Sequence, residues 1–211
     1  MEQSDIIRCY NTTAKSYAEQ YKDEIGKKHL DQVLLRSFAA ENLNSRIIDL
    51  GCGPGQTTKY LSDCGAADLI GVDISPSMIE AAKRMYPSIV FETADMLNLQ
   101  YTDNSFGAAI AFYSIVHFDD RQVETAFGEI KRVLLNGASF LFSFHIGDHV
   151  VHLDEFLGHR VSMDFHFFET EKIIALLRGI GFTIIDIIER APYPEIEYPS
   201  KRAYIWAKVS N

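Results

Sequence analysis

The stretch Asp49-Leu50-Gly51-Cys52-Gly53-Pro54-Gly55-Gln56 decides how this chain of 211 residues folds. It follows the apolar run Arg46-Ile47-Ile48 and leads into a segment with helical periodicity, so a strand ends in a glycine turn that opens a helix. Small residues at such a turn let the backbone approach a ligand closely. The stretch therefore predicts an α/β fold with a ligand site where its first strand ends.

The carboxylate of Asp49 narrows the kind of ligand that this turn would hold. A dinucleotide would place a pyrophosphate here, and like charges in a low-dielectric cleft repel strongly. An amino-acid ammonium group would be attracted instead. The turn therefore predicts a site for S-adenosylmethionine, which carries adenosine at one end and the methionine ammonium at the other.

Composition limits the size and the partners of the protein. At 47% hydrophobic, 211 residues suffice for one domain with a full core, so we expect a single domain over residues 1–211. The net charge is −9, and the 20 Lys and Arg residues are scattered among 29 acids. Nucleic-acid readers need a concentrated basic face, and anionic membranes attract basic segments. A small molecule is therefore the expected partner, with no nucleic acid and no membrane.

Targeting signals and cysteines indicate a compartment. Residues 1–13 show no basic segment followed by an apolar one, and the longest apolar run, Phe106–Val116, is far shorter than the roughly 20 residues that span a bilayer. The three cysteines form no Cys-x-x-Cys pair. We therefore expect a cytoplasmic protein without a disulfide scaffold; the oligomeric state, monomer or homodimer, stays open.

The chain alternates strand, turn and helix. Continuously apolar strands of this kind indicate a doubly wound, Rossmann-like sheet of seven strands, mostly parallel, with helices on both faces. Because only a short loop joins the last two strands, we expect them to form an antiparallel hairpin. The expected strands are Arg46–Leu50, Asp68–Asp73, Ile89–Thr93, Ser105–Phe112, Ser139–Phe144, Phe182–Ile188 and Arg202–Val209.

Helix signals fall between these strands. Ser75 is predicted to cap a helix that begins at Pro76, and Thr170 to cap a later one that Gly181 ends. The helix that begins at Asp119 is expected to end at Gly137. The other predicted helices are Ser4–Tyr21, Lys27–Asn42 and Gln56–Asp63.

Two further acids stand where strands end. Asp73 lies about 20 residues beyond the glycine turn, a spacing that suits hydrogen bonds to ribose hydroxyls. Asp95 follows the third strand and could accept from the adenine amine, with the Met96 amide donating to a ring nitrogen. The glycine turn, Asp73 and Asp95 would each, taken alone, also fit a purely structural turn or cap. All three, however, stand at the ends of consecutive strands.

These motifs resemble those of the class I S-adenosylmethionine-dependent methyltransferases, nearer the branch of ubiquinone and menaquinone biosynthesis. They are Asp49-Leu-Gly-Cys-Gly-Pro-Gly55, Gly71-Val-Asp73, Ala94-Asp95-Met96 and Phe112-Tyr113-Ser114-Ile115-Val116-His117. The segment Tyr10 to Tyr17 is similar to the family's Tyr-Asp-x-x-Ala-x-x-Tyr motif, with Asn11 in place of Asp.

The resemblance implies methyl transfer to an O, N, S or C nucleophile of a small molecule, with release of S-adenosylhomocysteine. It implies a lid helix within residues 1–26. The cofactor-binding residues implied are Tyr17, Asp49, Gly51, Gly53, Gly55, Gln56, Asp73, Ile74, Met78, Asp95, Met96 and Phe112.

The acceptor side is expected to contain histidines and aromatic residues. His117 and His145 are candidate general bases, and each could equally be a hydrogen-bonded histidine in the pocket wall. The stretch 146–168 is too long for an ordinary connection and is predicted to cap the substrate. Its histidine spacing fits no standard zinc site, so no metal is expected. The predicted pocket residues are Tyr21, Tyr113, His149 and His166.

Other functions remain open. A non-catalytic module that binds S-adenosylmethionine or S-adenosylhomocysteine would keep the three acids and have a closed acceptor pocket. A methyltransferase acting on a macromolecule is a further alternative. A nicotinamide-dependent oxidoreductase is disfavoured by Asp49 and by Gly-x-Gly-x-Gly in place of Gly-x-Gly-x-x-Gly.

Overall fold

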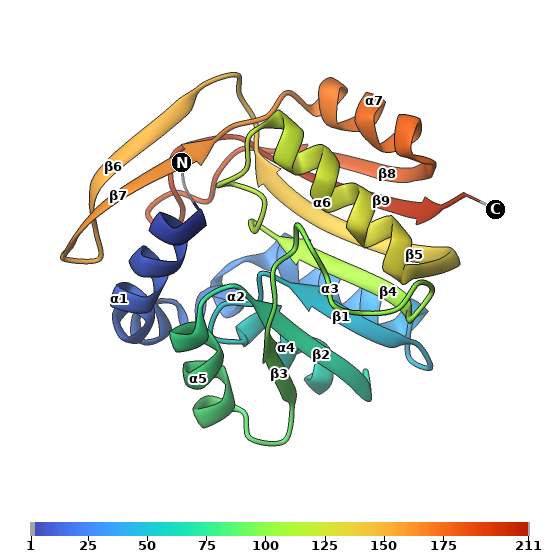
Figure 1. The fold of residues 1–211 in the computed structure, drawn as a ribbon, viewed down its shortest axis with the longest axis horizontal. Coiled ribbons are helices and arrows are strands. Elements are labelled where there is room, and N and C mark those ends of the chain that lie inside the picture. Colours follow the sequence, from blue (N-terminus) through green and yellow to red (C-terminus); the bar gives the residue numbers. More distant parts are fainter. Residues whose placement is uncertain (1–2, 211) are drawn as a thin grey trace.

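The computed structural model describes residues 3–210, and its centre is a sheet of seven strands (Figure 1). The strand order is β3-β2-β1-β4-β5-β9-β8, in which only the pairs formed by β9 are antiparallel. The predicted mostly parallel sheet with an antiparallel end is confirmed. The strands are β1 (Arg46–Leu50), β2 (Asp68–Asp73), β3 (Val90–Thr93), β4 (Phe106–Phe112), β5 (Leu134–His145), β8 (Phe182–Arg190) and β9 (Arg202–Val209).

Helices cover both faces of this sheet. On one face, α6 (Asp120–Val133) and α7 (Thr170–Ile180) pack their apolar stripes on β4 and β5. On the other face, α3 (His29–Glu41) and α4 (Gln56–Asp63) pack on β1 and β9. Neighbouring residues of β1 serve the two sides, because Ile48 belongs to the first core and Ile47 to the second, and both are fully buried. Burial on both sides explains why the strands are continuously apolar.

Of the three helix ends predicted at Ser75, Thr170 and Gly181, two are confirmed by the structure and one is wrong. Ser75 accepts a hydrogen bond from the Met78 amide at the start of α5 (Pro76–Met85), as predicted. Gly181 ends α7 with a φ of 103°, also as predicted. Thr170, in contrast, is the first residue of α7 and makes no cap; its hydroxyl donates to Glu189.

The predicted end of α6 at Gly137 is wrong. The helix ends at Val133 because Leu134 is extended and pairs with Phe106 as the first residue of β5. β5 is therefore longer than the predicted Ser139–Phe144, and Gly137 lies within it.

Two segments lie over the carboxyl ends of the central strands. The first contains α1 (Gln3–Tyr21) and the short α2 (Glu24–Lys27). The second is the predicted cap, which folds as a hairpin of β6 (Val150–Phe156) and β7 (His159–His166), separate from the main sheet. A hydrogen bond of 2.7 Å from the His166 amide to the Val116 carbonyl ties β7 to the loop after β4.

Within residues 3–210, no helix combines the length and apolar character needed to cross a membrane.

Candidate active site

A cavity of about 360 Å³ opens at the carboxyl ends of the strands, where β1 and β4 are neighbours and the chain crosses from one half of the sheet to the other. This is where open α/β sheets bind ligands. The strand-tip wall of the cavity comes from lining residues within 51–57, 72–78 and 94–96. The distal wall comes from α1, α2, the start of α3 with Lys28 and Asp31, the β6–β7 hairpin and residues within 196–202.

The backbone of the glycine turn forms part of the strand-tip wall, because Gly51 and Gly53 line the cavity. Gly51 has a φ of 69°, and a Cβ atom there would lie 2.3 Å from the Cβ of Ser114. Gly53 has a φ of 54° and faces open space, because a Cβ atom there would meet nothing within 4 Å. Gly51 therefore permits close packing against the end of β4, whereas Gly53 leaves room beside the cavity.

Two residues that the sequence assigned to the ligand do not line the cavity: Asp49 and Gly55. Asp49 is 2% exposed, and its Oδ2 accepts a hydrogen bond of 2.6 Å from Thr58 Oγ1 below the turn. Burial raises the pKa of Asp49 to about 7. At Gly55 a Cβ atom would lie 2.7 Å from the Phe91 ring, so its role in the structure is packing. Asp49 supports the turn from beneath.

Asp73 lines the cavity and holds the turn in place. Its Oδ2 accepts from the Gly53 amide at 3.0 Å and its Oδ1 from the Ser75 amide at 2.8 Å. A carboxylate oxygen has two lone-pair sites, so each still has capacity for a ligand hydroxyl. Burial raises the pKa of Asp73 to about 6, against the opposing effect of these two amides.

The remaining predicted cofactor residues meet on the cavity wall. Asp95 accepts from the Leu97 amide at 2.9 Å, which orients its carboxylate. The amide oxygen of Gln56 is buried and has no hydrogen-bond partner among residues 3–210, so it is available to a ligand donor. The predicted residues that line the cavity are Tyr17, Gly51, Gly53, Gln56, Asp73, Ile74, Met78, Asp95, Met96 and Phe112.

Helix α1 is fastened beside Asp73. Asn11 Oδ1 accepts from Ser75 Oγ at 2.8 Å and from the Ser77 amide at 3.2 Å. This places Tyr10, Tyr17 and Tyr21 of α1 at the cavity, with the rings of Tyr17 and Tyr21 4.5 Å apart. The tyrosine-rich segment therefore forms part of the distal wall, where the lid helix was predicted.

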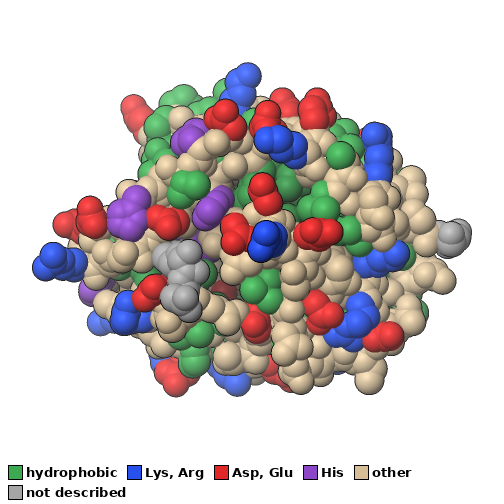
Figure 2. Space-filling view, turned by 45° about the horizontal axis from the view of Figure 1, so that its top comes forward, with side chains coloured by type: hydrophobic (Ala, Val, Ile, Leu, Met, Phe, Trp, Pro, Cys, Tyr) green, Lys and Arg blue, Asp and Glu red, His purple; other side chains and the backbone are tan. Residues whose placement is uncertain are grey.

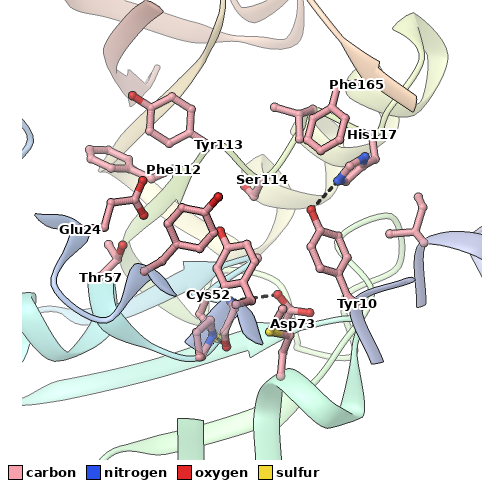
Figure 3. Close-up of a pocket in the computed structure, with 18 of the residues that line it drawn as sticks. Tyr10, Glu24, Cys52, Thr57, Asp73, Phe112, Tyr113, Ser114, His117 and Phe165 are labelled. Carbon is pink, nitrogen blue, oxygen red and sulfur yellow. Dashed lines mark hydrogen bonds between the residues drawn. The ribbon is translucent and has the colours of Figure 1, made fainter. Parts of the chain in front are cut away.

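His117 contacts Tyr10 inside the cavity (Figure 3). The Tyr10 hydroxyl lies 2.6 Å from His117 Nε2, and His117 Nδ1 lies 2.8 Å from the Asp164 carbonyl oxygen. Burial lowers the pKa of His117 to about 4. The imidazole is therefore neutral at physiological pH, as a base must be before it takes a proton.

His145, the second candidate base, lies at another part of the cavity. Its Nδ1 is 2.7 Å from Ser200 Oγ, and its ring contacts Tyr113 and Phe167. Burial and then the nearby Arg202 and Lys28 lower its pKa to about 4. It too is neutral.

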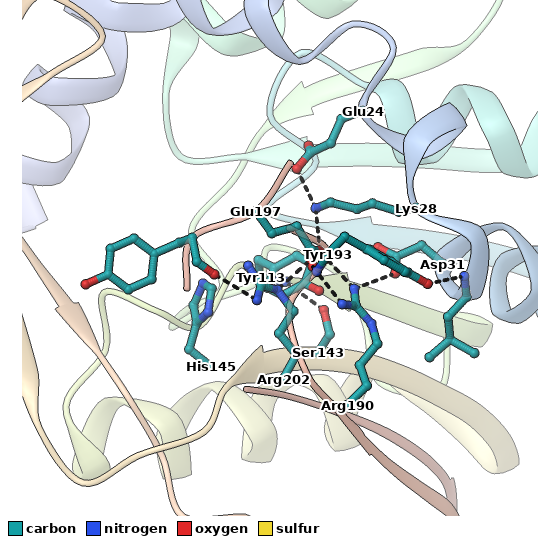
Figure 4. A network of polar contacts seen from close by, with 12 residues as sticks. Glu24, Lys28, Asp31, Tyr113, Ser143, His145, Arg190, Tyr193, Glu197 and Arg202 are labelled. Atoms are coloured by element: carbon teal, nitrogen blue, oxygen red, sulfur yellow. Dashed lines mark hydrogen bonds and ion pairs between the residues drawn. The ribbon is translucent and has the colours of Figure 1, made fainter. Parts of the chain in front are cut away.

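Beside His145 lies a charge cluster of Glu24, Lys28, Asp31, Arg190, Glu197 and Arg202 (Figure 4), and all of these except Arg190 line the distal wall of the cavity. Arg190 donates to both oxygens of Glu197, at 2.6 and 2.8 Å. Burial alone would raise the pKa of Glu197, but the hydrogen bonds from Arg190 and from the Tyr193 amide lower it to about 2. Three cations thus balance three carboxylates, so the cluster can fix the shape of this wall without a large net charge.

Of the other predicted pocket residues, Tyr21 and Tyr113 line the cavity, whereas His149 and His166 do not. His149 stacks on the outer side of the wall, with its ring 4.3 Å from that of Phe167. Tyr113 has a φ of 54°, and its hydroxyl lies 2.7 Å from that of Tyr204.

Several lining residues had no sequence signal strong enough to single them out: Tyr10, Glu24, Lys28, Ser114, Glu197 and Arg202. Tyr10 stood within a recognised motif, but no local pattern placed it opposite His117. Among residues 3–210 no group of three His, Cys, Asp or Glu side chains could hold a metal ion.

On the face drawn in Figure 2, acidic and basic side chains are interspersed, and no patch of one sign covers it. The cavity, in contrast, has a marked asymmetry of charge. Its strand-tip wall contains two carboxylates, Asp73 and Asp95, and no Lys or Arg. Such a wall is unfavourable for a pyrophosphate and favourable for a cation.

Comparison with known proteins agrees with this geometry. A family described as "Methyltransferase domain" matches residues 47–137, which include the glycine turn, Asp73, Asp95 and His117. The chain is 28% identical over 182 residues to an O-methyltransferase of Penicillium expansum, covering 81% of this chain and 63% of that protein. It is 28% identical over 158 residues to an O-methyltransferase of Aspergillus sclerotiorum, covering 71% of this chain and 59% of that protein.

The chain thus spans about three fifths of the length of these curated relatives. Among solved structures, a SAM-dependent methyltransferase of Methanosarcina mazei superposes with a TM-score of 0.71 at 18% identity, over 79% of this chain and 92% of that one. That likeness shows the fold. A methyltransferase-domain family thus matches the segment that carries the strand-end motifs, and the chain has the fold of a solved S-adenosylmethionine-dependent methyltransferase.

Proposed function

We propose that the protein is an enzyme that transfers the methyl group of S-adenosylmethionine to an oxygen atom of a small molecule. The observation that carries the proposal is the asymmetry of the cavity. A strand-tip wall with two carboxylates and no cation suits a sulfonium ligand, and the same cavity continues to a neutral histidine. When bound, the cofactor supplies an electrophilic methyl group on a positively charged sulfur.

The residues on the strand-tip wall fit this cofactor from end to end. Asp73 would accept from the ribose hydroxyls with its free lone pairs, and Asp95 with the Met96 amide would contact adenine. The methionine end would lie along the turn at Gly51 and Gly53 and against Tyr17. The open space at Gly53 and the unpartnered oxygen of Gln56 are the features that a ligand would fill and satisfy. Asp49 would act on the turn and not on the ligand.

Oxygen is the proposed acceptor atom for two reasons. The relatives from Penicillium expansum and Aspergillus sclerotiorum bear the name O-methyltransferase. A neutral hydroxyl also needs to lose its proton during transfer, and His117 is an uncharged base in the cavity. Transfer to N, S or C is the alternative, and the placement in the ubiquinone and menaquinone branch stays a prediction.

The size and cover of the cavity favour a catalytic role on a small molecule. About 360 Å³ lies within the range of small-molecule sites, and the space extends beyond the strand tips to the distal wall. A module that only binds the cofactor would have no use for that extension. A macromolecule would have to displace α1 or the β6–β7 hairpin, which contribute Tyr10, Tyr17 and Phe165 to the wall.

Replacement of Asp73 tests the cofactor assignment. Asp73→Ala removes the acceptor for the ribose hydroxyls and the anchor of the Gly53 amide, so S-adenosylmethionine affinity should fall by about 10- to 100-fold. Calorimetry gives the dissociation constants. Asp68→Ala is the matched control, because Asp68 begins the same strand β2 and its side chain is 69% exposed. An unchanged affinity in the Asp73 variant would refute the assignment.

A further inference from the structure

The tautomer of His117 follows from its two hydrogen bonds. Its Nδ1 lies 2.8 Å from the carbonyl oxygen of Asp164, which can only accept, so Nδ1 carries the ring proton. In the neutral ring Nε2 then has a free lone pair. The Tyr10 hydroxyl, 2.6 Å away, must be the donor in that bond.

The surroundings of the pair keep both groups uncharged. The groups that face His117 are Tyr10 of α1 and Asp164 and His166 of β7, and burial is the largest effect on its pKa, which it lowers. Burial likewise raises the pKa of Tyr10, and the nearby Asp73 raises it further. At neutral pH the shared proton therefore stays on Tyr10.

The O–H group of Tyr10 is already used as the donor in the hydrogen bond to His117. A ligand can therefore contact this hydroxyl only through a lone pair on its oxygen. A substrate hydroxyl can donate to that oxygen, whereas a carboxylate has no proton to give and would meet an oxygen lone pair. Aromatic side chains surround this point: the ring of Phe165 lies 4.7 Å from that of His117, and those of Phe156 and Tyr17 lie 6.3 Å apart. Flat walls of this kind favour a conjugated ring.

We propose that Tyr10 contacts the acceptor and passes its proton to His117, so that the enzyme methylates a phenolic or enolic hydroxyl and not a carboxylate. This inference rests on the proposed function. It gives helix α1 a chemical role in addition to its predicted role as a lid.

The proton transfer balances. The acceptor's O–H bond breaks and its proton moves to Tyr10, while the proton of Tyr10 moves to Nε2 of His117. The acceptor oxygen uses the freed electron pair to form a bond with the methyl carbon, and the sulfur keeps the electron pair of the broken S–C bond. Tyr10 ends as it began, and His117 ends as an imidazolium that carries the charge formerly on sulfur. Its proton is later lost to solvent.

The anchor of α1 fixes where Tyr10 acts. Asn11, the next residue, accepts from Ser75 Oγ and the Ser77 amide, and the Ser75 amide donates to Asp73. One chain of hydrogen bonds thus connects the proposed ribose acid with the segment that carries Tyr10. The relay is assembled only when α1 is docked.

Histidine NMR tests the relay without turnover. In protein labelled with ¹⁵N-histidine, His117 should show a protonated Nδ1 and an unprotonated Nε2. Tyr10→Phe removes the donor that stabilises the neutral ring, so the pKa of His117 should rise. Tyr101→Phe is the control, since it removes a tyrosine hydroxyl bound to Glu92; Tyr101 packs on Phe106 at the start of β4, whereas His117 follows the end of that strand. An Nε2-protonated ring, or a pKa that Tyr10→Phe leaves unchanged, overturns the proposal.

Turnover with simple probes tests the substrate class. With a panel of phenols of graded acidity, Tyr10→Phe should lower kcat by about 100-fold for the least acidic phenols and less for the most acidic, which need little help to lose a proton. S-adenosylmethionine affinity, measured by calorimetry, should fall much less than kcat, because Tyr10 is proposed to contact the acceptor. A loss confined to KM, or methylation of benzoate in preference to the phenols, overturns the proposal. Failure of the wild type to bind S-adenosylmethionine contradicts the proposed function, and the NMR spectrum still decides the Tyr10–His117 bond.

Discussion

The two walls of the cavity are held together in different ways. The strand-tip wall comes from short segments of neighbouring strands, and main-chain hydrogen bonds fix it, such as those from the Gly51 and Cys52 amides to the Val72 carbonyl. The distal wall joins segments far apart in the sequence, and side-chain bonds and ion pairs fix it. The comparison teaches that the proposed cofactor end depends on backbone conformation, whereas the proposed acceptor end depends on a few charged and aromatic side chains.

The charge cluster should be the most sensitive part of the distal wall. Glu197→Gln leaves Arg190, Arg202 and Lys28 without their shared carboxylate, in a site where the Glu197 side chain is 1% exposed. Removal of one partner from a buried ion pair costs about 3–5 kcal/mol, and we expect a loss of unfolding free energy in that range. Urea denaturation measures it.

A surface ion pair provides the control for this effect. Glu41→Gln breaks the contact between Glu41 and Lys208, whose side chains are 41% and 37% exposed. It should cost less than about 1 kcal/mol. Equal losses in the two variants would mean that the cluster does not stabilise the distal wall.

The strand-tip wall can be tested with two glycines of one turn. In Gly51→Ala the new Cβ atom meets Ser114 at a positive φ, so unfolding free energy should fall by about 2–5 kcal/mol. In Gly53→Ala only the backbone conformation is unfavourable, at about 1–2 kcal/mol, because the Cβ atom would point into open space. Thermal unfolding should therefore rank Gly51→Ala as the more damaging.

Ligand affinity should respond differently in the same pair of variants. The methyl group added at Gly53 occupies the space assigned to the ligand. The folded Gly53→Ala protein should therefore bind S-adenosylmethionine more weakly than the wild type, even though its loss of unfolding free energy is small. A Gly53→Ala variant with the wild-type dissociation constant would show that the ligand does not approach this part of the turn.

The pH dependence of cofactor binding should be the smallest effect. The pKa of Asp73 is about 6 in the free protein, and an ionised carboxylate is the stronger acceptor for ribose hydroxyls. Affinity should therefore be fully developed above pH 6 and fall as the pH drops through that value, by up to about tenfold at pH 5. Titration calorimetry should also detect proton release on binding near pH 6. In Asp73→Asn both effects should disappear.

The sequence predicted the strand-tip wall well because its features are local. Each acid stands at or just beyond the end of a strand, and the carboxyl ends of parallel strands meet at one edge of the sheet. The exception is Asp49, whose side chain points under the turn to Thr58. The turn motif predicts that the Asp49 carboxylate faces the ligand. The direction of that side chain, however, depends on its hydrogen bond with Thr58, a helical residue nine positions later.

The distal wall could not be predicted to the same degree. Tyr10 and His117 are 107 residues apart and meet because Asn11 docks α1 on α5. Glu197 lies in a connection that carried no signal beyond its length, although it joins Lys28, Arg190 and Arg202. The excursion at residues 146–168 was recognised by its length, but its hairpin form depends on pairing that a sequence pattern of this kind does not specify.

The attachment of α1 has a consequence for exchange with solvent. This helix lies outside the hydrogen-bonded central sheet. Polar contacts such as Asn11–Ser75 and Tyr10–His117 help to hold it in place. We therefore expect α1 to unfold locally and uncover the cavity while the central strands stay intact. Slow amide hydrogen exchange in α1 would then report a loaded molecule, and fast exchange an open one.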